Sequence, residues 1–114
     1  MGRVVEQLAC WHLQRAGLIH LAHNVQYKQG ELDLVMQDRD TIVFVEVRYR
    51  RNTYFGSGTD TIDRHKQGKL WRCAQLYLVQ NAYLAESPCR FDVIAASGTP
   101  PKLTWIKNAF FDIT

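Results

Sequence analysis

The sequence predicts an α/β fold, a mixed β-sheet flanked by helices, in the order helix, three strands, helix, two strands. An N-terminal segment carries apolar residues at helical spacing, and the three stretches after it alternate or are rich in β-branched residues. A second helical segment then precedes two more strands. With 114 residues, 46% of them hydrophobic, the chain can bury one core, so we predict a single domain over residues 1–114.

The first helix and the first strand follow from the spacing of apolar residues. Val5 and Ala9 recur at helical spacing within residues 2–16, and Gly17 suits the left-handed conformation that ends many helices. In residues 19–27 mostly apolar or aromatic side chains occupy every second position, which predicts a strand.

The second and third strands are predicted to form a hairpin. Residues 30–35 and 42–49 are rich in apolar and β-branched side chains, and the polar segment 37–41 separates them. A two-residue loop at 39–40 and a four-residue loop at 38–41 both pair residues whose numbers sum to 79.

This register brings acidic residues together, with Asp33 opposite Glu46 and Glu31 opposite Arg48. Directly opposed residues have Cβ atoms roughly 4.5–5.5 Å apart, close enough for two carboxylates to bind one divalent cation. Burial of Glu46 in an apolar strand requires a partner cation, a metal or a proton. Neutralisation of both acids by nearby arginines, and a simple salt bridge between Glu31 and Arg48, are the plainer alternatives.

The remaining elements are a loop, a helix and two strands. The polar, glycine-bearing segment 51–60 is predicted to be a loop, and Asp63 can cap a helix that runs to about Ala82. Residues 90–96 and 103–106 are predicted strands. Because the helix connects the third strand to the fourth, these two strands should be parallel.

Positive charge is concentrated in residues 48–72, which contain seven Arg and Lys but only two Asp. The whole chain has a net charge of only +3. Such a segment beside a strand that carries a carboxylate is expected where a metal site meets a phosphate backbone. A solvated helix face explains the charge equally well. The basic residues are Arg48, Arg50, Arg51, Arg64, Lys66, Lys69 and Arg72.

The cysteines and histidines indicate the cellular compartment and argue against a zinc site. The three cysteines are widely spaced, so we expect reduced thiols in a cytoplasmic protein, and no apolar run is long enough to suggest contact with a membrane. The histidines lack zinc-ligand spacing with cysteine, and there is no glycine-rich phosphate loop.

Several separated motifs resemble the bacterial YraN family over nearly the whole chain. The matching residues, in order, are Glu6, Gly30 to Leu34, Val43 to Arg50, Phe55-Gly56, Lys66, Ala74 to Leu78 and Arg90 to Val93. The resemblance implies a restriction-endonuclease-like core, in a superfamily that includes archaeal Holliday-junction resolvases. By analogy with those resolvases, a homodimer is expected.

The resemblance also implies a PD-(D/E)xK nuclease site. Asp33 and Glu46 would be the two metal-binding acids, and Glu6 the helix carboxylate that completes the site in resolvase-like members. With the hairpin register, the expected ligands of Mg²⁺ or Mn²⁺ are Asp33, Glu46, the carbonyl of Val47, Glu31 and Glu6.

One position departs from the family motif, because Arg48 stands where the catalytic lysine belongs. Lysine can lose a proton and help to activate water, whereas arginine stays charged. Three accounts follow: the metal activates water alone, Lys66 supplies the amine, or the protein binds nucleic acid without cutting it. We therefore expect an endonuclease acting on structured or branched DNA, with Asp33, Glu46, Arg48 and Lys66 as catalytic residues. The alternatives are a non-catalytic nucleic-acid-binding module and a protein-interaction scaffold.

Overall fold

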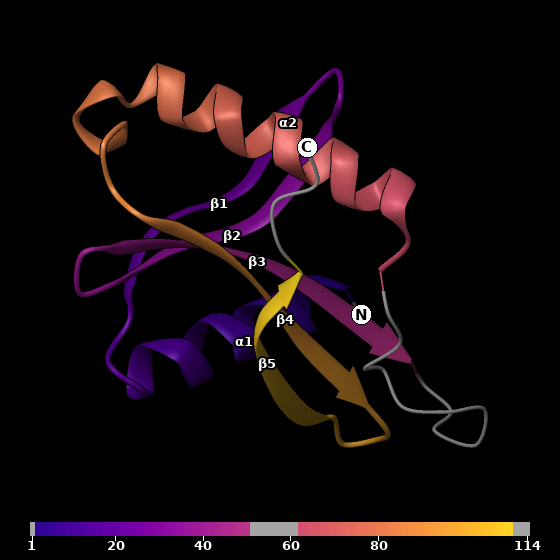
Figure 1. Ribbon diagram of the computed structural model, residues 1–114. Coiled ribbons are helices and arrows are strands. Elements are labelled where there is room, and N and C mark those ends of the chain that lie inside the picture. The colour runs from indigo at the N-terminus through magenta and orange to yellow at the C-terminus, as the bar shows by residue number, and fades with distance from the viewer. Residues whose placement is uncertain (1, 51–61, 111–114) are drawn as a thin grey trace.

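In the computed structural model, two helices cover opposite faces of one sheet (Figure 1). The structure describes residues 2–50 and 62–110, and across these ranges the strand order is β1-β2-β3-β4-β5, with β3 and β4 parallel and the other neighbours antiparallel. The predicted α/β class and element order are confirmed. The elements are α1 (Gly2–Arg15), β1 (Ile19–Tyr27), β2 (Gly30–Asp38), β3 (Thr41–Arg50), α2 (Arg64–Gln80), the 3-10 helix η1 (Ala82–Leu84), β4 (Cys89–Ser97) and β5 (Lys102–Phe110).

Strand β3 is buried on both faces, which explains its almost continuous apolar sequence. Val43 and Val45 pack in the cluster under α1, while Ile42 and Phe44 pack in the cluster under α2. The helices contribute Ala9 and Leu13 from α1, and Leu70, Cys73, Ala74 and Tyr77 from α2.

The hairpin between β2 and β3 has the predicted register. Its pairs run from Asp38–Thr41 to Leu34–Val45, so paired residue numbers sum to 79. The loop is the two-residue alternative, because Asp38 and Thr41 are already paired. Arg39 adopts a φ of 60°, as tight hairpin loops require.

Beyond the pair Leu34–Val45, β2 and β3 diverge and form a fork (Figure 1). The first residues of β2 remain paired with β1, whereas β3 from Glu46 onward is paired with β4. The expected opposition of Glu31 and Arg48 is therefore wrong, because the ladder between these strands ends before it reaches them. Leu32 packs under α2 and Leu34 under α1, so regular alternation also breaks at Asp33.

The helix ends agree closely with the sequence. Gly17 has a φ of 103° after α1, and the Asp63 side chain caps α2 as predicted. Helix α2 ends at Gln80, slightly earlier than Ala82, because η1 begins there. The loop predicted at 51–60 lies outside the described residues, and no helix that the structure describes is long and apolar enough to cross a membrane.

Strand β5 extends beyond the predicted 103–106 because a buried acid on β4 holds it. Asp92 is fully buried and accepts hydrogen bonds from the indole N–H of Trp105 at 2.9 Å and the backbone N–H of Asn108 at 3.0 Å. Arg90 Nε donates to the same carboxylate at 3.0 Å, and Nη2 of Arg90 lies 3.1 Å from Oδ2 of Asp38. The part of the strand after residue 106 was not predicted, because the exposed Lys107 and Asn108 interrupt the apolar pattern.

Candidate metal centre at the strand fork

The divergence of β2 and β3 leaves backbone hydrogen-bonding groups to be satisfied by side chains. The N–H of Val47, two residues beyond the last paired residue Val45 on β3, donates to Oδ2 of Asp33 at 2.9 Å. A carboxylate thus takes the place that a β2 carbonyl would hold in a continued ladder. The bond fixes Asp33 in the opening of the fork. The predicted metal contact of Val47 was through its carbonyl, and it stays a prediction.

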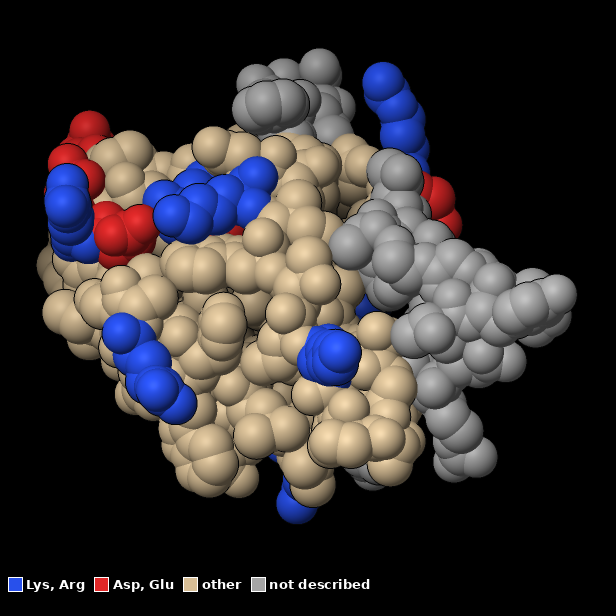
Figure 2. Space-filling view, turned by 90° about the horizontal axis from the view of Figure 1, so that it is seen from below, with Lys and Arg blue, Asp and Glu red and all other residues tan. Residues whose placement is uncertain are grey.

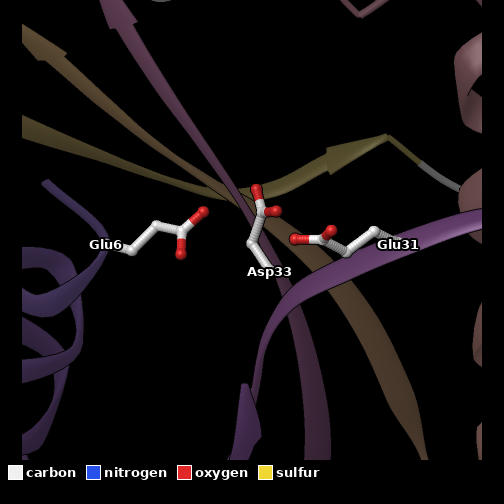
Figure 3. Close-up of side chains that lie close together, drawn as sticks. All are labelled: Glu6, Glu31 and Asp33. Carbon is white, nitrogen blue, oxygen red and sulfur yellow. The ribbon is translucent and has the colours of Figure 1, made fainter. Parts of the chain in front are cut away.

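Three carboxylates from two elements meet at this opening. Glu6 of α1, Glu31 and Asp33 each offer an oxygen, and these oxygens all lie within 4.8 Å of one another. In Figure 3, Asp33 lies between the other two, with Glu6 approaching from the helix and Glu31 from β2. Of the four predicted acidic ligands, Glu6, Glu31 and Asp33 are therefore brought together, whereas Glu46 is not a member of this cluster and lies beside Asp33.

A fourth participant at the fork, Asn24, was not among the predicted site residues. Its side-chain nitrogen, with the amide oriented toward the acids, donates to Glu6 Oε1 at 2.8 Å and to Glu31 Oε2 at 3.1 Å. Asn24 has a φ of 51°, a conformation that asparagine tolerates better than most residues. An asparagine inside a strand and opposite the first motif acid was the signal available in the sequence.

Negative charge at the fork is poorly compensated. Burial raises the pKa of Asp33 to about 8, and the charge of Glu46 and a hydrogen bond to it act in the same direction, while the Val47 N–H opposes them. Burial and the charge of Glu31 also raise the pKa of Glu6. Near pH 7 and without a cation, the cluster therefore retains a proton that an isolated aspartate would lose.

The partner of the buried Glu46 is Lys66. Only 6% of Glu46 is exposed, and the Nζ atom of Lys66 lies 2.6 Å from its Oε2. The start of α2 sets this position, because the Asp63 carboxylate accepts the backbone N–H of Lys66 at 2.8 Å. A buried Glu46 was expected to need a partner cation, a metal or a proton, and the structure shows a partner cation, Lys66 of α2.

A cleft of about 550 Å³ opens over these groups. It joins the acids of the fork to the first turns of α2, and its lining includes Glu31, Asp33, Glu46, His65, Lys66 and Lys69. A neighbouring hollow of about 260 Å³ shares Glu46 and Lys66 and contains Arg48. Strand alternation predicts that Arg48 lies on the same side of β3 as Glu46, and both residues line this hollow.

The predicted basic residues divide into two groups. Lys66 and Lys69 line the cleft, while Arg64 and Arg72 are exposed on α2. Arg51 and the side chain of Arg50 lie outside the described residues. Seen from below, where α1 and the β4–β5 hairpin lie, Lys and Arg are scattered over the surface (Figure 2). Of the predicted basic residues, Lys66 and Lys69 therefore share the cleft with the acids, and Arg48 shares the neighbouring hollow with Glu46.

Comparison with known proteins places these residues within one family. The model of the family described as "Uncharacterised protein family UPF0102" matches residues 5–96. A UPF0102 protein of Xylella fastidiosa (strain M12) is 51% identical over 109 residues, covering 96% of this chain and 90% of the relative. One from Xanthomonas campestris pv. campestris (strain B100) is 52% identical, covering 96% and 89%. One from Pseudomonas fluorescens (strain Pf0-1) is 51% identical, covering 96% and 91%.

Proposed function

Because the chain belongs to the UPF0102 family, which confirms the resemblance to the YraN proteins, we propose its function from its own residues: a metal-dependent endonuclease with a restriction-endonuclease-like core that acts on structured or branched DNA. The observation that carries this proposal is the convergence of Glu6, Glu31 and Asp33 beside the buried Glu46. A stable core gains nothing from four acids at one opening.

The donor set fits a hard divalent cation. Every side-chain donor at the fork is a carboxylate oxygen, the ligand type that suits Mg²⁺ and Mn²⁺. Burial and the charges of neighbouring carboxylates raise the pKa values of Asp33 and Glu6, so a cation bound between them would stabilise their ionised forms. Asp33, Glu46, Glu6 and Glu31 would hold the ion. When bound, Mg²⁺ or Mn²⁺ supplies Lewis-acid stabilisation and lowers the pKa of a coordinated water.

The chain's own residues account for the remaining work. The Val47 N–H keeps Asp33 turned toward the opening, and Asn24 holds Glu6 and Glu31 together. Lys66 lies against Glu46 at the mouth of the cleft, with 53% of its side chain exposed, so it can contact a phosphate that enters. A cation fixed at that place stabilises negative charge that develops on the phosphate during hydrolysis.

The other basic residues position the nucleic acid. Lys69 in the cleft, Arg48 in the neighbouring hollow, and Arg64 and Arg72 on α2 would contact flanking phosphates. Phosphate contacts fix orientation and carry no sequence code. We therefore propose recognition of DNA shape, with no preferred base sequence.

The test is the double variant Asp33→Asn, Glu46→Gln, titrated calorimetrically with Mn²⁺ and Mg²⁺ and assayed on branched, flapped and single-stranded DNA. The expected result is loss of metal binding and of cleavage. Asp40→Asn, Glu86→Gln is the matched control, since it makes the same charge change at two exposed acids. Metal binding and cleavage that survive in the first double variant would contradict the proposal.

One observation favours a second function, nucleic-acid binding without cleavage. Position 48 is arginine, which cannot give up a proton to help activate water. The two functions separate in the first double variant. A binding module should bind DNA more tightly once Asp33 and Glu46 are neutral, whereas a nuclease should lose metal-enhanced affinity.

A further inference from the structure

A second groove, of about 630 Å³, lies between α1 and β1 and adjoins the acid cluster. Glu6 and Asn24 line it, and the oxygens of Glu6 lie within 4.8 Å of those of Glu31 and Asp33, which line the cleft beside α2. The two hollows therefore meet at the carboxylates. A nucleic-acid strand with one phosphate at the carboxylates would have the cleft on one side of that phosphate and this groove on the other.

The groove carries an aromatic side chain that the fold does not use. Trp11 is 53% exposed, whereas Trp71 and Trp105 pack against the two core clusters. Exposure of an indole leaves apolar area in water, and bases stack on such rings with a gain of about 1–3 kcal/mol per base. Trp11 therefore offers a stacking surface beside the proposed metal centre.

The rest of the lining suits a nucleotide better than an apolar protein segment. Gln7 and Gln14 supply amide groups from α1, and Arg3 supplies a cation at the same wall. On the opposite wall the rings of His20 and His23 are joined by a hydrogen bond of 2.9 Å. The volume of the groove lies within the range of about 300–1,000 Å³ that is usual for small-molecule ligands.

We propose that this groove binds an unpaired nucleotide next to the phosphate at the metal centre, with its base stacked on Trp11, so that the substrate is single-stranded on the α1 side. The inference rests on the proposed function and assigns it a substrate class. A base within a duplex is covered on both faces by its neighbours, and only an unstacked base can place a face against the indole.

The experiment measures binding of a labelled single-stranded oligonucleotide and of a blunt duplex of the same length, with Ca²⁺ in place of Mg²⁺ to limit cleavage. Trp11→Ala should weaken single-strand binding about 5- to 160-fold, as the loss of one stacked base predicts. Trp11→Phe should retain most of it, and duplex binding should not change. Tyr83→Ala is the matched control, because Tyr83 is an exposed aromatic residue on η1, 78% exposed.

A set of oligonucleotides, each with one abasic position, gives a second measurement. One abasic position should remove the difference between Trp11→Ala and the unaltered protein. The proposal would be overturned if Trp11→Ala and the unaltered protein bound the single strand equally well, or if the variant lost duplex binding to the same extent. It would also be overturned if the unaltered protein did not bind the single strand, or if the only effect of the variant were a change in the sedimenting mass of the protein.

The outcomes separate this inference from the nuclease proposal. If Trp11→Ala leaves single-strand affinity intact while Asp33→Asn, Glu46→Gln abolishes cleavage, the proposed nucleotide site in the groove is wrong and the nuclease proposal is supported. If no metal supports cleavage but Trp11→Ala still weakens single-strand binding, the groove stands without the nuclease.

Discussion

The ammonium group of Lys66 and the buried carboxylate of Glu46 form an ion pair of 2.6 Å that joins α2 to β3. The pair places a lysine beside the second motif acid, although position 48, where the motif has its lysine, holds arginine. Because Lys66 reaches Glu46 from another element, α2 would supply, under the proposed function, the amine that the family resemblance places at position 48.

The first prediction concerns this amine. Lys66→Met should lower kcat about 100- to 1,000-fold, the usual cost of removing one group that stabilises transition-state charge. It should also lower the free energy of unfolding in EDTA by about 1 kcal/mol, a small effect because Lys66 is half exposed. Mn²⁺ should offset that loss by neutralising Glu46. Cleavage kinetics and urea unfolding with and without Mn²⁺ measure both effects.

Two variants control for general loss of positive charge. Lys69→Met changes another lysine of the same cleft and should raise KM more than it lowers kcat. A larger loss of kcat in Arg48→Met than in Lys66→Met would show that the strand arginine, and not the helix lysine, has the principal role.

The second prediction follows from the proton held by Asp33. Its pKa is raised from 3.8 to about 8, so between these values the folded state binds a proton that the unfolded state has lost. Through this group the free energy of unfolding of the metal-free protein falls as pH rises from 3.8 to about 8 and then levels off. Asp33→Asn should remove that slope. Urea unfolding across this pH range in EDTA is the measurement.

The same proton opposes metal binding, so affinity for Mn²⁺ should rise by up to about tenfold per pH unit below the pKa of Asp33. Calorimetry in buffers with different ionisation enthalpies should detect release of a proton on binding at pH 7. Affinity that is independent of pH would mean that Asp33 is already ionised in the metal-free protein.

The third prediction assigns a positioning role to Asn24. Removal of its amide should weaken Mn²⁺ binding about 10- to 100-fold, as loss of a group that orients metal ligands commonly does. Asn24→Gly is the cleaner variant, since glycine accepts the φ of 51° without strain, whereas Asn24→Ala adds a backbone cost. Both should lose metal affinity alike, and the alanine variant alone should lose additional stability.

Gln26→Ala is the control for Asn24, because Gln26 also donates to Glu31, at 3.3 Å, whereas Asn24 donates to both Glu6 and Glu31. It should change metal affinity much less. Equal effects of the two variants would mean that any loss of a hydrogen bond to Glu31 disturbs the site.

The fourth prediction separates stability from function. Asp92→Asn should destabilise the protein by about 3–5 kcal/mol, because the Arg90 guanidinium would lose its buried counter-charge. The groups that donate to Asp92 lie on β4 and β5, so metal affinity of the folded variant should stay close to that of the unaltered protein. Thermal unfolding and Mn²⁺ titration at low temperature test the two halves. Loss of both would tie Asp92 to the fork.

The hairpin register could be predicted because the turn and the apolar pattern both constrain it. Polar residues fix the loop at Arg39-Asp40, and a slip by one residue would turn the apolar residues of β3 to the wrong faces. The register predicted Asp33 directly opposite Glu46, but the ladder ends one step earlier at Leu34–Val45, and the two acids meet through their side chains.

The fork was beyond such reasoning, because alternation of side chains does not tell where two strands stop pairing. Glu31 was expected against Arg48, but it turns to Asn24 and Gln26 of the neighbouring strand. Lys66 was a candidate for the amine through the family resemblance, yet its contact with Glu46 depends on how α2 crosses the sheet, which is a tertiary property.

The bond from Val47 to Asp33 turns one backbone amide into a spectroscopic reporter of the fork. The nitrogen and proton resonances of Val47 should respond to the charge of the carboxylate that accepts its proton at 2.9 Å. A pH titration followed at this resonance would report the ionisation of Asp33 together with the carboxylates coupled to it, apart from the distant acids of the chain. Addition of a diamagnetic ion such as Mg²⁺ would shift the same signal, so a single cross-peak would report occupancy of the centre without any substrate.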